Sequence, residues 1–96
     1  MFLVVMHRSG PLWDKSLPME EQLNWPEHAA FMDELVDEGF IVLGGPLSDE
    51  TRVVPVVDAE SEAVIRAAFA RDPWSETLLH IRDAEPWTIR LDGRRR

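Results

Sequence analysis

His28 and Asp72 are the residues whose types and positions best suit acid–base chemistry in this sequence. The segment WPEHAAFMDELVDEGF, residues 25–40, has the apolar spacing of an amphipathic helix, and its stripe extended back by one turn reaches His28. The first turn lies at the positive end of the helix dipole, which disfavours an imidazolium. A neutral imidazole there is suited to accept a proton if a carboxylate orients it.

Asp72 is the carboxylate best placed for that role. It follows the apolar stripe of a second expected helix and precedes Pro73, so it turns out of that helix near the same sheet. Asp37 and Glu38 lie farther along the first helix and off its apolar stripe. Two plainer interpretations stay open: His28 as a buried histidine satisfied within the core, and Asp72 as an ordinary turn residue.

A pocket is expected beside His28. Gly44, Gly45 and Pro46 end a predicted strand, and glycines let the backbone approach a ligand closely. We expect the pocket to be lined by Trp13, Trp25, Gly45, Pro46 and Trp74. A simple turn at Gly-Gly-Pro, and tryptophans that serve only as core, are the alternatives.

The sequence gives little support for a metal site, for a cofactor or for a serine or cysteine nucleophile. The sequence has no cysteine, and the three histidines are too scattered for a metal site, so we expect neither metal nor cofactor. His7 and His80 fall on predicted strands, where a structural or exposed role is the simpler interpretation. The serines lack the context of a catalytic nucleophile.

Length and charge define the broad class. With 96 residues, 45% of them hydrophobic, we expect a single domain over residues 1–96, with a frayed basic tail at 93–96. The net charge of −8 argues against nucleic-acid binding. The N-terminal apolar run is too short for a signal peptide or a membrane span, so we expect a cytoplasmic protein without membrane association.

The helices and strands that must position these residues are predicted from the spacing of apolar residues and from capping residues, glycines and prolines. Strands are expected at 2–7, 40–47 and 53–57, with one or two more within 77–83 and 87–91, and helices at 25–38 and 59–72. Asn24 is the expected N-cap of the first helix, in capping-box spacing with Glu27, and Gly39 its end. Pro55 places its strand at an edge, or limits it to pairing on one side there.

This order, β-α-β-β-α-β, predicts an α+β fold of ferredoxin-like arrangement, with two helices on one face of an antiparallel sheet. The predicted strands carry apolar residues at both parities, so both faces of the sheet need covering. One helix layer covers only one face. A homodimer that pairs through its sheet faces is therefore expected.

The segments WPEHAAFMDELVDEGFIVLGGPL, RDPW and AEPWTIRL together resemble the YCII-related (YciI-like) family, in order and over nearly the whole chain. The resemblance implies a dimeric α/β barrel, in the superfamily of muconolactone isomerases and small monooxygenases. It also implies an active site on a His–Asp pair, which maps to His28 and Asp72. Several members have an arginine where this chain has Trp25, which disfavours recognition of an anionic substrate at that position.

We therefore expect a small cofactor-free enzyme, or enzyme-like protein, that acts on a small cyclic or unsaturated metabolite. His28 would remove or return a proton, as in isomerisation or dehydrohalogenation, and Asp72 would orient its other ring nitrogen. The alternatives are a non-catalytic metabolite-binding or regulatory dimer, and a structural dimer without a ligand. The residues name no substrate.

Overall fold

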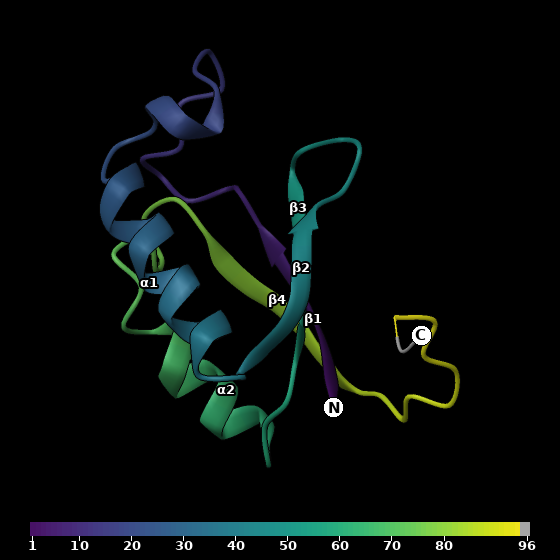
Figure 1. The fold of residues 1–96 in the computed structure, drawn as a ribbon. Helices are drawn as coiled ribbons and strands as arrows, with labels where there is room; N and C mark the ends of the chain where they lie inside the picture. Colours follow the sequence, from purple (N-terminus) through teal and green to yellow (C-terminus); the bar gives the residue numbers. More distant parts are fainter. Residues whose placement is uncertain (95–96) are drawn as a thin grey trace.

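The structure is a computed structural model that describes residues 1–94; Arg95 and Arg96, the end of the predicted basic tail, lie outside the described residues. Figure 1 shows a sheet with both helices on one face and the C-terminal segment on the other side. The elements in chain order are β1 (Phe2–His7), a 3₁₀ turn η1 (Met19–Glu21), α1 (Trp25–Asp37), β2 (Ile41–Pro46), β3 (Arg52–Val57), α2 (Glu62–Phe69) and β4 (His80–Pro86).

The four strands form one sheet in the order β2-β3-β1-β4, and every neighbouring pair is antiparallel. An α+β chain with two helices and such a sheet is compatible with the predicted ferredoxin-like fold. β1 lies in the interior, flanked on both sides, which agrees with its nearly continuous apolar sequence. The two edges of the sheet are β2 and β4.

Pro55 does not mark an edge strand, because β3 lies between β2 and β1. Pro55 pairs with Gly44 of β2, whereas the ladder to β1 skips Val54 and Pro55 and resumes at Val53. The missing N–H is thus accommodated by pairing on one side only, which is the second alternative that the sequence left open.

The C-terminal end of α1 is built as expected. Gly39 has a positive φ of 80°, and its N–H donates to the carbonyl of Val36. The N–H of Phe40 donates to the carbonyl of Leu35, which completes a Schellman motif.

The predicted capping box at the start of α1 is wrong. Asn24 does occupy the N-cap position, but its backbone is left-handed, with φ of 61°, and its side chain makes no capping hydrogen bond. Asparagine tolerates this conformation better than most residues, so here it supplies a backbone turn and not a side-chain cap. That turn sets the direction in which α1 leaves the preceding loop.

The second helix is shorter than the predicted span of 59–72. The sequence offers Ser61 and Asp58 as N-caps, and the structure uses Ser61, whose side chain accepts a hydrogen bond from the backbone N–H of Val64 at 3.3 Å. The helix ends at Phe69, and turns carry the chain to Asp72. The helix therefore ends about one turn earlier than the sequence pattern indicates. Asp72 lies outside it, as expected.

The core lies between the sheet and the helices, and its largest member comes from a loop. Trp74, Leu78 and Leu79 are buried, although residues 77–79 were expected to begin a strand. Of the one or two final strands expected within 77–83 and 87–91, the described structure has one, β4, and residues 87–91 form no strand. The other buried hydrophobic residues are Val4, Met6, Leu35, Ile41, Val56, Val57, Ile65 and Phe69.

The sheet face opposite the helices is partly apolar. Leu3 and Val5 alternate with the buried Val4 and Met6 along β1, so they point to this second face. Leu43 of β2 is 48% exposed. The C-terminal segment lies on the same side (Figure 1), and a small cavity of about 220 Å³ there is lined by Leu43, Val56 and several residues of 87–94.

Candidate active site

His28 and Asp72 are in direct contact, so the predicted pairing is confirmed, although 44 positions separate them in the chain. The Nδ1 atom of His28 lies 2.8 Å from both carboxylate oxygens of Asp72. Both side chains are nearly buried, with exposed fractions of 9% and 2%. A carboxylate accepts hydrogen bonds, so this geometry requires the proton of a neutral imidazole to be on Nδ1.

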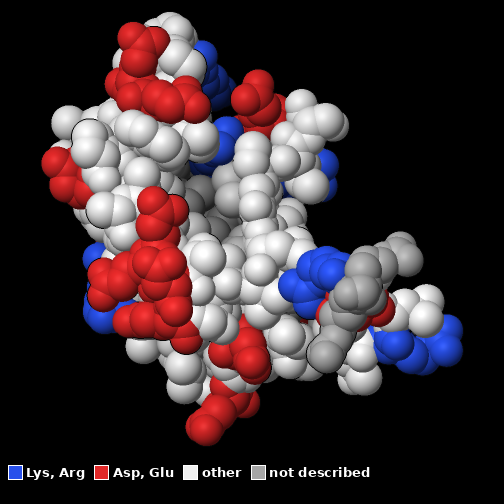
Figure 2. Space-filling model, in the orientation of Figure 1, with Lys and Arg blue, Asp and Glu red and all other residues white. Residues whose placement is uncertain are grey.

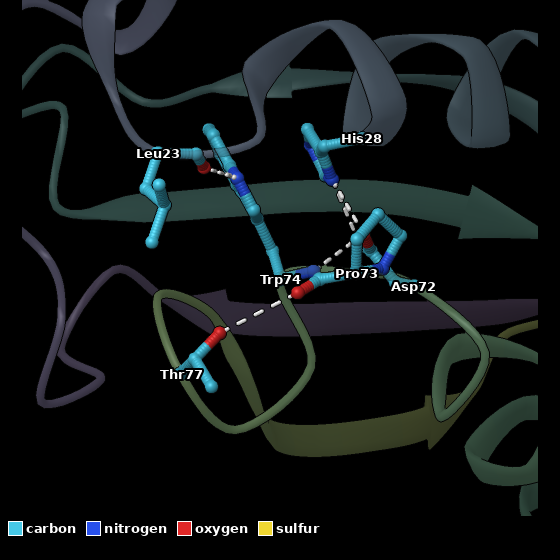
Figure 3. A network of polar contacts seen from close by, with 6 residues as sticks. All are labelled: Leu23, His28, Asp72, Pro73, Trp74 and Thr77. Atoms are coloured by element: carbon cyan, nitrogen blue, oxygen red, sulfur yellow. Dashed lines mark hydrogen bonds and ion pairs between the residues drawn. The ribbon is translucent and has the colours of Figure 1, made fainter.

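The loop after α2 aims the Asp72 carboxylate. The backbone N–H of Trp74 donates to its Oδ1 atom at 3.0 Å, and the N–H of Ser75 donates to its backbone carbonyl at 2.8 Å. This is an Asx-type turn, in which the aspartate side chain bonds to the backbone two residues later. Figure 3 shows the carboxylate held between this turn and the imidazole.

Trp74 fixes the plane of the imidazole. Its indole is stacked on the His28 ring, with the ring centroids 3.9 Å apart and the planes 5° from parallel. The indole Nε1–H donates to the carbonyl of Leu23 at 2.6 Å, just before α1 begins (Figure 3). Trp74 thus ties the loop that carries Asp72 to the helix start that carries His28.

A cavity of about 600 Å³ lies beside this pair, between α1 and strands β2 and β3. Its size is typical of sites for small organic ligands. Among the described residues, no hydrogen bond to Nε2 of His28 is present, and His28 lines the cavity. The imidazole edge opposite Asp72 therefore carries a lone pair without a protein partner. The other lining residues include Met32, Val36, Ile41, Val53, Pro55 and Leu79.

Four of the five expected pocket residues line this cavity: Trp25, Gly45, Pro46 and Trp74. Trp13 does not. It packs edge-on against Trp74, with centroids 5.7 Å apart, so it supports a wall of the cavity from behind. The glycines differ as well: a Cβ on Gly44 would lie 2.9 Å from Cα of Pro55, whereas a Cβ on Gly45 would meet nothing within 4 Å.

Arg8 is a cavity residue that sequence reasoning missed. It follows β1, is only 7% exposed and lines the same cavity as His28. Its guanidinium donates to the carbonyl of Glu50 at 2.8 Å and to Sδ of Met19 at 2.9 Å, and it lies over the ring of Trp13. No periodicity or motif singles out this residue, since arginines at strand ends are usually exposed.

The charge around the cavity is uneven. Acidic side chains run over the α1 side of the hollow in Figure 2, and basic atoms lie at its upper end. Arg8 and Asp33 are the charged residues that line the cavity, and Asp33 is exposed on α1. Burial lowers the pKa of the Arg8 guanidinium from its ordinary value, whereas Glu50 and Glu20 act in the opposite direction.

Within residues 1–94, no cluster of histidine, aspartate or glutamate side chains has a geometry that could hold a metal ion. No helix in this part of the chain combines the length and apolar character needed to cross a membrane. Comparison of the chain with models of protein families, with curated proteins and with solved structures found no significant match.

Proposed function

We propose that this protein is a small acid–base enzyme of YciI-like type, in which His28 transfers a proton to and from a small organic molecule. The observation that carries the proposal is the environment of one imidazole. Its Nδ1 faces a buried carboxylate, and its Nε2, at the wall of a largely apolar cavity, has no hydrogen-bond partner within residues 1–94. This is the arrangement of a general base with an orienting group.

Each neighbour of His28 has a distinct part in such a reaction. Nε2 accepts a proton from the ligand, and Asp72 then stabilises the imidazolium across the short contact to Nδ1. The face of Trp74 also attracts a cationic ring, because the face of an indole is electron-rich. Both effects oppose the helix dipole, which disfavours positive charge in the first turn of α1. Return of the proton to another atom of the ligand completes an isomerisation.

The same residues suit a dehydrohalogenation, in which the base removes a proton from carbon while halide leaves. Either reaction needs a positioned base and a cavity that excludes water. General acid–base catalysis typically contributes about 10²–10⁴-fold, so positioning in the cavity must supply the remainder. Non-catalytic binding of a metabolite at this site is the alternative outcome.

The proposal includes a homodimer that pairs through the sheet faces. Leu3, Val5 and Leu43 support it, since they leave apolar surface on the face that the helices do not cover. A partner sheet would bury this surface in both chains and generate a closed α/β barrel from two copies.

The test of the acid–base role is solvent deuterium incorporation into a panel of unsaturated lactones and halogenated aromatic compounds. His28→Ala should lower any incorporation or turnover at least about 100-fold, because the base is lost. His80→Gln is the matched control, since His80 is not among the residues that line this cavity. Far-UV circular dichroism checks that both variants fold. Turnover that persists in folded His28→Ala would contradict the proposal, and binding without turnover would favour the metabolite-binding alternative.

A further inference from the structure

Arg8 is a buried cation that no carboxylate of residues 1–94 contacts directly, although the negative charges of Glu50 and Glu20 favour its charged form. None of the ion pairs formed by residues 1–94 includes it. Its recorded acceptors are a carbonyl oxygen and a thioether sulfur, which are both uncharged. Its Nε atom is buried and has no hydrogen-bond partner among the described residues. Burying a charge in this way is costly unless something opposite in sign completes the site.

The surroundings hold this guanidinium at the cavity. The contact with Glu50 links it to the β2–β3 connection, the contact with Met19 links it to η1, and Trp13 stacks beneath it. Trp13 in turn packs on Trp74. The cation is thereby fixed by three different segments, in the same chain of aromatic contacts that fixes the imidazole.

We propose that the ligand of this cavity is a carboxylate, with its anionic group bound by Arg8 and its reacting carbon facing His28. Guanidinium groups bind carboxylates through paired N–H donors, which gives both affinity and orientation. In the part of the chain that the structure describes, each terminal nitrogen of Arg8 has one acceptor, and each of these nitrogens carries two N–H donors. This inference rests on the proposed function and specifies its substrate class.

The proposed carboxylate site at Arg8 is not the position at which YciI-like proteins have their arginine. Trp25 occupies the helix position at which several YciI-like proteins have an arginine, so that position offers no cation here. Arg8 enters the same cavity from the end of β1. With a net charge of −8 and an acidic α1 rim, the chain as a whole repels anions. A carboxylate would therefore bind through this local contact and not through the overall field.

The test compares phenylacetate with phenylacetamide, which share their ring and nearly their shape but differ in charge. Each probe is titrated into the protein, and its affinity is obtained from the change in the NMR signals of the His28 ring. Wild type should bind phenylacetate about 10- to 100-fold more tightly than phenylacetamide, as for a hydrogen bond to a charged group. Arg8→Gln should abolish this preference, Arg8→Lys should retain part of it, and Arg90→Gln, which removes an exposed arginine, should leave it unchanged.

Wild type decides the question even if Arg8→Gln fails to fold. Equal affinity for the two probes, or no binding of phenylacetate at millimolar concentration, would overturn the carboxylate proposal. A preference that persists in folded Arg8→Gln would overturn it too. The acid–base proposal fails separately: a carboxylate preference in a protein whose turnover survives His28→Ala would leave Arg8 as an anion site and remove His28 as the base.

Discussion

The imidazole of His28 and the indole of Trp74 lie face to face, with centroids 3.9 Å apart and planes within 5° of parallel. The same indole donates to the carbonyl of Leu23, and the backbone of Trp74 donates to Asp72. One residue therefore contacts both members of the acid–base pair and the start of α1. Trp74 is a positioning residue as well as a wall of the cavity.

Trp74→Phe tests this positioning. The smaller ring preserves an aromatic face but loses the donor to Leu23 and leaves unfilled space, so the free energy of unfolding should fall by about 1–3 kcal/mol. Trp87→Phe is the control, because Trp87 is 46% exposed, and its effect should stay within about 0.5 kcal/mol. Urea denaturation measures both. Equal effects of the two substitutions would show that the contacts of Trp74 carry no special weight.

Asp72→Asn tests the orientation of the imidazole. The carboxylate selects the tautomer protonated on Nδ1, whereas an amide can present either its oxygen or its NH₂ group. We expect ¹⁵N NMR at neutral pH to show the Nδ1–H tautomer in wild type and a mixture in Asp72→Asn. Asp83→Asn, at an exposed position of β4, should leave the ¹⁵N signals of His28 as they are in wild type. Unchanged tautomers in Asp72→Asn would mean that Asp72 does not orient His28.

Asp72 and His28 should also behave as one unit in any activity found. Once His28 is replaced by alanine, the further change Asp72→Asn should cost little, because Asp72 acts through the imidazole. The single Asp72→Asn variant should lose activity in kcat more than in KM. Additive losses in the double variant would indicate two independent roles.

Trp13 and Trp25 are expected to respond differently to a ligand. Trp25 lines the cavity, whereas Trp13 lies behind Trp74. The change in tryptophan fluorescence on adding phenylacetamide should diminish in Trp25→Leu and persist in Trp13→Leu. A response lost only in Trp13→Leu would place the ligand outside this cavity.

Gly44 and Gly45 provide a matched pair. A methyl group on Gly44 would press on the backbone of Pro55, so Gly44→Ala should destabilise the fold by about 1–3 kcal/mol. Gly45→Ala meets open space and should change stability by less than about 1 kcal/mol. Thermal denaturation monitored by circular dichroism distinguishes the two. Equal destabilisation would contradict the close approach of β2 and β3 at Gly44.

The proposed dimer is tested at Leu43. Sedimentation at micromolar concentration should give about twice the monomer mass for wild type, as for a two-fold dimer. Leu43→Lys puts a charge on the sheet face opposite the helices and should yield monomers. Val64→Lys adds the same charge at a similarly exposed apolar position on α2 and should remain dimeric. A folded wild-type monomer would rule out the pairing.

Local sequence was sufficient for the features that depend on torsion angles and short-range hydrogen bonds. The end of α1 at Gly39 was predicted correctly, and Ser61 was one of the two N-caps expected for α2. Asp72 lies outside α2 as expected, although the helix already ends at Phe69. The end of α1 follows from glycine's access to positive φ, and the cap of α2 from a serine oxygen that accepts a nearby N–H. The His28–Asp72 contact was predicted too, because both residues were expected near the same face of one sheet.

Tertiary packing decided the rest. Asn24 uses its backbone and not its side chain, and Trp13 packs behind Trp74 instead of lining the cavity. Arg8 is buried because Glu50 and Met19, far from it in the chain, supply its acceptors and Trp13 covers it. The free energy of such contacts depends on which segments meet after folding. The residues next to Arg8 in the sequence do not specify these contacts. The residues that surround Arg8 at the cavity are therefore known only from the three-dimensional structure.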